Sequence, residues 1–166
     1  MDTRGQHEHA PVKNITKVER NSDREVVVTR SFDAPARLVF EAWSNPELFK
    51  RWWVPKSMGM TLRSCEMDVR TGGRYRLGFG DGMDFFGRYL EVTPPSRIVW
   101  TNEEGGENSS VTTVTLTETD GKTLLVMSEL FPSKEALDTD GGGAADATHE
   151  TFKQLDELLV DLASKS

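Results

Sequence analysis

The sequence predicts an α+β domain in which a strand and two short helices precede an antiparallel sheet, and a long helix comes last. Between residues 60 and 131, apolar and polar residues alternate with a period of two, interrupted by short turn-forming segments. Residues 146–163 instead show the spacing of an amphipathic helix. The chain has 166 residues, and one sheet followed by one long helix at this length indicates a single domain with one core.

The folded domain is expected to cover residues 24–166. Residues 1–23 are polar, carry mixed charge and lack periodicity, which predicts a flexible tail. The segment Glu25–Phe32 then contains three successive valines and has the length of a strand. We expect this strand to be buried on at least one face.

Two prolines mark the short helices that follow the first strand. Pro35 precedes the apolar stripe of residues 36–43, and Pro46 follows Asn45, a residue type that favours the N-cap position. The second helix is expected to run over residues 46–53, because Pro55 stops it.

Turn signals divide the central part of the chain into six strands. The turn segments are Thr71–Gly73, Gly80–Gly82, Thr93–Pro95, Glu103–Gly106 and Thr119–Gly121. Strands joined by such short turns pair antiparallel, because parallel pairs need long crossover connections. The sheet is therefore expected to be a meander.

The last part of the chain is expected to be helical. Pro132 and Ser133 begin a short helical segment, and the glycine-rich stretch Asp138–Gly143 predicts a hinge or loop. The pattern of Asp146–Ala163 then predicts a long amphipathic helix that covers the sheet.

The composition argues against several classes of partner. The chain has 20 Lys and Arg against 27 Asp and Glu, and its net charge of −7 does not suit binding to a nucleic-acid backbone. No apolar run approaches the ~20 residues of a membrane span. A single cysteine, Cys65, and the lack of an apolar signal-like stretch indicate a cytoplasmic protein. We expect no nucleic-acid partner and no membrane insertion.

The aromatic residues of the strands are candidates to line an interior space, because one helix cannot cover the whole face of a long sheet. Residues of matching parity on their strands are Tyr75, Leu77 and Phe79; Phe86, Leu90 and Val92; and Ile98 and Trp100. Wide apolar pockets with a few polar groups suit small hydrophobic ligands. Parity alone leaves a fully packed core as the other interpretation.

Two polar residues are candidates for proton transfer. Glu129 shares its strand parity with Leu125 and Met127, so that it faces inward unless the strand end brings it to water. His149, near the start of the last helix, is either an acid–base group or a surface histidine beside Glu150.

Other motifs do not support a site. His7-Glu8-His9 lacks further metal ligands, and Gly78–Gly82 leads into a strand where phosphate binding needs a helix. Cys65 is expected to pack as a small apolar residue. We expect no metal site and no cofactor, and no set of catalytic residues stands out.

The order of these segments resembles START-like (SRPBCC) proteins, in the branch homologous to the activator of heat-shock protein 90 ATPase. The segments that carry the resemblance are Arg30–Pro35, Val39–Trp43, Asn45–Leu48, Arg51–Trp53, Asp68–Arg70, Gly72–Tyr75, Gly87–Glu91, Pro94–Pro95, Leu130–Glu135 and Leu155–Leu159. Together they extend over about residues 24–163.

The resemblance implies a helix-grip fold, in which a curved antiparallel sheet wraps around the C-terminal helix and leaves a cavity between them. Members of the superfamily bind lipids, sterols, polyketides or plant hormones, and some catalyse cyclisation or dehydration; fold alone does not choose among these activities. The chain departs from the pattern at Gly143–Ala147, where Ala144 stands in place of a methionine, and we expect a wider pocket on that side.

The leading hypothesis is that the domain binds a small hydrophobic or aromatic molecule, lipid-like or polyketide-like, in this cavity. The predicted ligand-binding residues are Trp53, Tyr75, Phe79, Phe86, Trp100, Met127, Glu129, His149 and Phe152. The alternatives are a cyclase or dehydratase that uses Glu129 or His149 for proton transfer, and a co-chaperone-like interaction module. A chaperone or a second copy of the chain would then be the partner.

Overall fold

The computed structural model adds one strand to the predicted order. It describes residues 14–59, 61–79, 84–104, 106, 109–140 and 143–165. Strand β1 (Lys17–Arg20) lies within the segment predicted to be a tail, and it pairs antiparallel with β2 (Glu25–Phe32). Residues 1–13 of the predicted tail, with the His7-Glu8-His9 motif, lie outside the described residues.

Both short helices begin at the predicted prolines. Helix α2 (Ala36–Ser44) follows Pro35, and α3 (Pro46–Trp52) begins one residue after Asn45. The Asn45 side chain accepts a hydrogen bond of 3.0 Å from the Glu47 amide, as an N-cap residue does. A short 3-10 helix, η1 (Lys56–Met58), comes next.

The six predicted strands are all present and form one antiparallel sheet with the first two. They are β3 (Ser64–Met67), β4 (Arg74–Gly78), β5 (Asp84–Thr93), β6 (Arg97–Asn102), β7 (Ser110–Thr119) and β8 (Lys122–Leu130). The strand order is β1-β2-β8-β7-β6-β5-β4-β3, so that β2 pairs with the last strand and β3 lies at the opposite edge. Strands β3 to β8 are the predicted meander.

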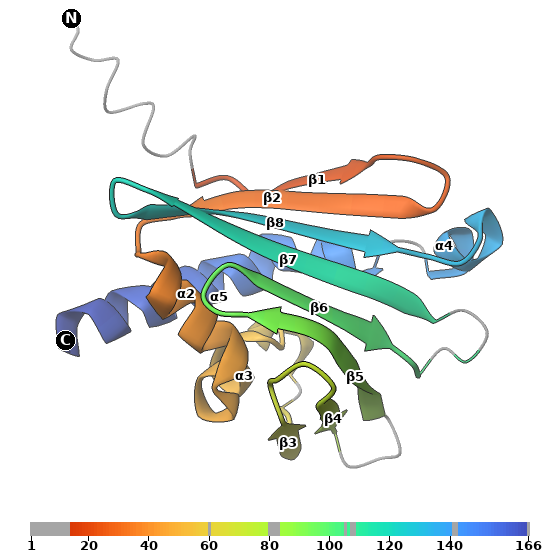
Figure 1. Ribbon diagram of the computed structural model, residues 1–166, viewed down its shortest axis with the longest axis horizontal. Helices are drawn as coiled ribbons and strands as arrows, with labels where there is room; N and C mark the ends of the chain where they lie inside the picture. The colour runs from red at the N-terminus through yellow and green to blue at the C-terminus, as the bar shows by residue number, and fades with distance from the viewer. Residues whose placement is uncertain are drawn as a thin grey trace, which may run out of the picture.

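The two C-terminal helices start and end differently from the prediction. Helix α4 (Lys134–Asp140) extends into the predicted loop, and α5 (Gly143–Lys165) begins three residues before the predicted start. Figure 1 shows α5 running behind the curved sheet, with α2 and α3 at one end and α4 at the other. This arrangement is the helix-grip fold.

The core lies between the sheet and α5. Alternate residues of β2 are buried, and fully buried Phe32 and Val28 face α5 together with Phe152 and Leu155 of that helix. The period of two in the strand and of 3.6 in the helix bring both apolar faces into one core. The apolar faces of these two elements therefore determine which side of α5 packs against the sheet.

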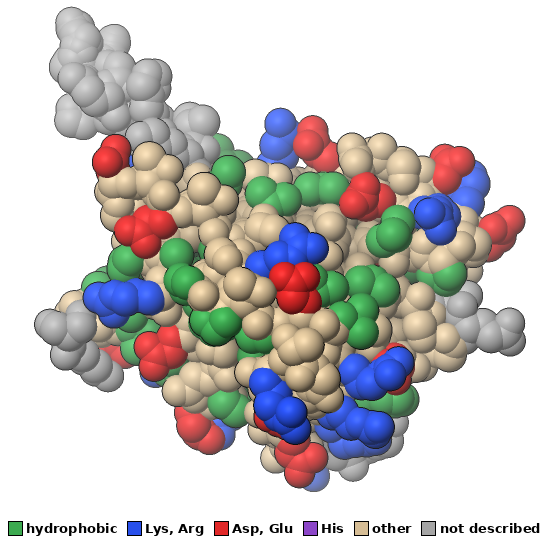
Figure 2. All heavy atoms as spheres, in the orientation of Figure 1, with side chains coloured by type: hydrophobic (Ala, Val, Ile, Leu, Met, Phe, Trp, Pro, Cys, Tyr) green, Lys and Arg blue, Asp and Glu red, His purple; other side chains and the backbone are tan. Residues whose placement is uncertain are grey.

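The outer face of the sheet carries paired charges. Arg88 lies 2.9 Å from Glu103, and Arg97 lies 3.1 Å from Glu91. Figure 2 shows acidic and basic side chains next to one another on this face, with no large area of one sign. Within the described residues, no helix is long and apolar enough to cross a membrane.

Candidate ligand-binding cavity

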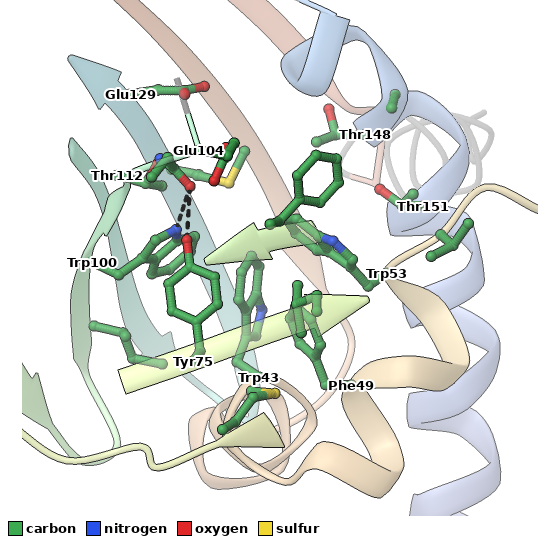
Figure 3. A pocket seen from close by; sticks show the side chains of 18 of the residues that line it. Trp43, Phe49, Trp53, Tyr75, Trp100, Glu104, Thr112, Glu129, Thr148 and Thr151 are labelled. Carbon is green, nitrogen blue, oxygen red and sulfur yellow. Dashed lines mark hydrogen bonds between the residues drawn. The ribbon is translucent and has the colours of Figure 1, made fainter. Parts of the chain in front are cut away.

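A cavity of about 370 Å³ lies between the inner face of the sheet, the short helices and α5 (Figure 3). This volume is within the range of small-molecule pockets. Most of the wall is aromatic, and the rings come from α2, α3, the loop after α3 and strands β4 to β6. The aromatic lining residues are Trp43, Phe49, Trp53, Tyr75, Phe79, Phe85, Tyr89 and Trp100.

The cavity reaches the surface at one side. Met58, Phe85 and Glu104 line it and are also exposed to solvent, with 55% exposure at Met58 and 37% at Phe85. These exposed side chains mark the side of the cavity that faces solvent. On the opposite wall, Ala147, Thr148 and Thr151 of α5 close the space.

The structure brings six of the nine predicted site residues to this cavity. These residues are Trp53, Tyr75, Phe79, Trp100, Met127 and Glu129. The strands place them there through parity: Tyr75 and Leu77 alternate inward on β4, and Met127 and Glu129 do so on β8. Glu129 lines the cavity and is half-buried.

Phe86 does not line the cavity, and the reason is a β-bulge. Val92 packs against the core, but the pairing of β5 with β6 shifts between Tyr89 and Glu91. A bulge adds one residue and reverses the alternation beyond it. Phe85 and Tyr89 therefore face inward, while Phe86 lies on the outer face under the guanidinium of Arg76, 5.0 Å from its ring centre.

Phe152 and His149 are also absent from the cavity wall. Phe152 is fully buried in the core, where its ring centre lies 5.6 Å from that of Phe32. His149 is exposed on α5, because the inward positions of that turn are Thr148 and Thr151. Of the two residues predicted for proton transfer, Glu129 alone lines the cavity.

Several lining residues were missed in the sequence. Asn102 shares the parity of Ile98 and Trp100, so the alternation could have identified it. Trp43 and Phe49 fall within the two predicted short helices, and nothing in the sequence shows that these helices reach the cavity. Figure 3 shows both rings on the cavity wall, between Tyr75 and Trp53.

A hydrogen-bond network forms one end of the wall. The Asn102 side-chain oxygen accepts from the Trp100 indole at 3.1 Å and lies 3.2 Å from the Tyr75 hydroxyl, as the dashed lines of Figure 3 show. The Asn102 amide nitrogen donates to Ser110 at 3.0 Å and to Thr112 at 2.8 Å. Ser110 in turn donates to the Glu129 carboxylate. The network connects side chains of four strands, β4, β6, β7 and β8.

The Tyr75 hydroxyl is a fixed donor in this network. It donates to the Thr101 carbonyl at 2.8 Å. Burial raises its pKa far above the usual value, and the negative charge of Glu104 adds to this effect. The Tyr75 hydroxyl is therefore protonated at neutral pH and acts as a donor.

The loop after α3 is held against α5 by polar contacts. The Gln154 amide donates to the carbonyls of Trp52 and Val54, both at 2.9 Å, and its oxygen accepts from the Lys56 amide at 2.9 Å. Ser57 donates twice to Glu150, and these bonds lower the pKa of the Glu150 carboxyl. Trp53 and Met58, which line the cavity, are positioned by these contacts.

Gly87 is required where β5 crosses β6. A Cβ atom at this position would lie 2.0 Å from the Thr101 carbonyl oxygen, the atom that also accepts from Tyr75. Gly87→Ala is therefore expected to lower the free energy of unfolding by about 1–3 kcal/mol through overpacking. Urea denaturation measures this loss. A matched Ser109→Ala variant on the adjacent loop should cost much less, and equal losses would contradict the assigned close approach.

The described residues contain no group of three or more His, Cys, Asp or Glu side chains that could hold a metal ion. Cys65 is half-buried, and burial raises the pKa of its thiol, so that it packs as a neutral side chain near Met67. The chemistry that the cavity offers is apolar contact, hydrogen bonding and the charge of two carboxylates.

The sheet, the long helix and the cavity between them define a START-like helix-grip protein. Residues 33–160 match the family described as Activator of Hsp90 ATPase homolog 1-like protein, and the chain belongs to this family. A search of curated proteins found no match.

Solved structures of the same fold come from several bacteria. A protein from Rhodobacter sphaeroides has a TM-score of 0.76 and 23% identity, over 89% of this chain and 99% of its own. A protein from Nitrosomonas europaea has a TM-score of 0.74 and 23% identity, over 86% and 98%. A protein from Mycobacterium smegmatis has a TM-score of 0.72 and 23% identity, over 89% and 99%. At these identities the likeness establishes the fold.

Proposed function

We propose that this protein binds a small hydrophobic or aromatic molecule, lipid-like or polyketide-like, in the cavity between the sheet and α5. The observation that carries the proposal is a cavity of about 370 Å³ whose wall is mostly aromatic and which opens to solvent beside Met58 and Phe85. A packed core of the same residues would leave no such volume. A cytoplasmic location is part of the proposal, since one cysteine cannot form an internal disulfide.

Aromatic walls favour flat, apolar ligands. Trp43 and Trp100 lie with ring centres 5.7 Å apart, and Trp53 stacks on Phe49 at 4.9 Å. Rings held at fixed positions lose little conformational entropy when a ligand binds, so that more of the contact energy appears as affinity. The proposed role is therefore recognition by a largely preformed pocket.

Titration with N-phenyl-1-naphthylamine, a neutral fluorescent molecule, tests the proposal. We expect saturable one-to-one binding with quenching of tryptophan emission, because three of the four tryptophans line the cavity. The melting temperature should rise with probe concentration, as it does for any ligand of the native state. Linear, non-saturating uptake with no change in melting temperature would contradict the proposal.

A further inference from the structure

We propose that the preferred ligand is a lipophilic cation: a protonated amine carried on an aromatic or aliphatic body. This inference depends on the binding function proposed above and adds the charge of the ligand. Three features of the cavity support it: the charges of its lining, the direction of its hydrogen bonds and its tryptophan rings.

The lining carries negative charge. Glu104 and Glu129 both line the cavity, and among the described lining residues there is no Lys, Arg or His. Both carboxylates raise the pKa of Tyr75, which places their charge near the same phenol. Figure 3 shows them at the end of the cavity that Tyr75 and Trp100 also form. An anionic ligand such as a fatty acid would lose its hydration there and also meet like charge.

At the end of the cavity formed by Tyr75, Trp100 and the two carboxylates, the wall side chains donate hydrogen bonds to other protein groups. The Trp100 indole and both hydrogens of the Asn102 amide donate within the wall, and so does the Tyr75 hydroxyl. Ser110 then donates to Glu129, which as a carboxylate can only accept. The donors of Trp100, Asn102, Tyr75 and Ser110 are thus engaged with protein acceptors, and the carboxylates at this end of the cavity offer acceptors to a ligand. A protonated amine has hydrogen-bond donors and no acceptor, so it can donate to the carboxylates at this end of the cavity.

The tryptophan rings add to the same preference. Trp43, Trp53 and Trp100 line the cavity, and tryptophan is the aromatic side chain that attracts cations most strongly. The net charge of −7 also attracts cations from solution toward the cavity mouth. An amine at the carboxylate end would leave the apolar body of the ligand against the remaining rings.

The test compares three probes that share one ring system. We would measure the dissociation constants of 1-naphthylmethylamine, 1-naphthalenemethanol and 1-naphthoate by calorimetry at pH 7. The amine is expected to bind at least about tenfold more tightly than the alcohol, as one charge-assisted hydrogen bond allows, and the carboxylate should bind most weakly.

Variants then assign the preference to the carboxylates. Glu129→Gln should weaken amine binding about tenfold and alcohol binding by a much smaller factor, because the amide keeps the shape and loses the charge. Glu104→Gln, at the exposed rim, should act in the same direction with a smaller effect. Glu157→Gln, an exposed position of α5 outside the lining, is the matched control and should change neither constant.

The possible results separate this inference from the proposed function. An alcohol or carboxylate that binds the wild-type protein as tightly as the amine would overturn the cation preference and leave cavity binding intact. Failure of all three probes to bind would contradict the binding function itself. An amine preference that survives both glutamate substitutions would also overturn the inference. The wild-type ranking decides the question if a variant does not fold.

Discussion

Phe152→Ala is expected to lower the free energy of unfolding by about 3–5 kcal/mol, the usual cost of removing a buried aromatic side chain. Phe152 is fully buried, and its ring centre lies 5.6 Å from Phe32, 6.1 Å from Trp52 and 6.4 Å from Trp43. These rings join α5 to β2 and the short helices. Urea denaturation followed by circular dichroism measures the loss.

Phe86→Ala is the matched control for this experiment. Phe86 and Phe152 were both predicted to line the ligand site, but Phe86 lies on the outer face of β5 in contact with Arg76. Its removal costs one exposed cation–π contact, about 0.5–1 kcal/mol. Similar losses in the two variants would show that the outward placement of Phe86 is wrong.

Asp156→Ala is expected to lower the free energy of unfolding by about 3 kcal/mol, because it leaves a buried guanidinium without its carboxylate. The Arg30 side chain is 4% exposed, and its nitrogen lies 2.9 Å from the Asp156 carboxylate. We expect the lower end of the range for buried pairs because Asp156 itself is 33% exposed. Thermal and urea denaturation measure the effect.

Two comparisons make the cause of this loss clear. Arg30→Met should cost less than Asp156→Ala, since it leaves the more accessible partner, a carboxylate that water can reach. Asp138→Ala removes an exposed carboxylate that pairs with Arg20 and Lys134, and it should cost much less than either. A loss at Asp138 as large as that at Asp156 would argue against a special role for burial.

The fold was predictable where one pattern extends over a whole element. Turn signals located all six strands from β3 to β8, and Asn45 and Pro46 located the start of α3. Strand β1 was missed because its four residues are mostly exposed, with a pattern that resembles a polar tail. A short edge strand depends on its partner β2 for its structure and less on its own sequence.

The candidate site was less predictable than the fold, because its geometry depends on features that no periodicity encodes. Because of the bulge in β5, Phe85 lines the cavity in place of the predicted Phe86. No sequence signal marks the position of this bulge. The helical pattern of α5 placed Phe152 on the apolar stripe, which packs in the core, whereas the α5 part of the cavity wall is formed by Ala147, Thr148 and Thr151. Which part is hollow depends on how the sheet curves away from the helix, and this is a property of the assembled fold.

Closing the cavity from within is the most direct test of its role in binding. Ala147 lines the cavity on α5, so Ala147→Trp would place an indole in the space, whereas Lys153→Trp adds the same ring to the exposed face of the helix. With folding confirmed by circular dichroism, affinity for N-phenyl-1-naphthylamine is measured in both variants. We expect Ala147→Trp to lose at least about tenfold in affinity while Lys153→Trp stays close to the wild type. Unchanged affinity in Ala147→Trp would contradict ligand binding in this cavity.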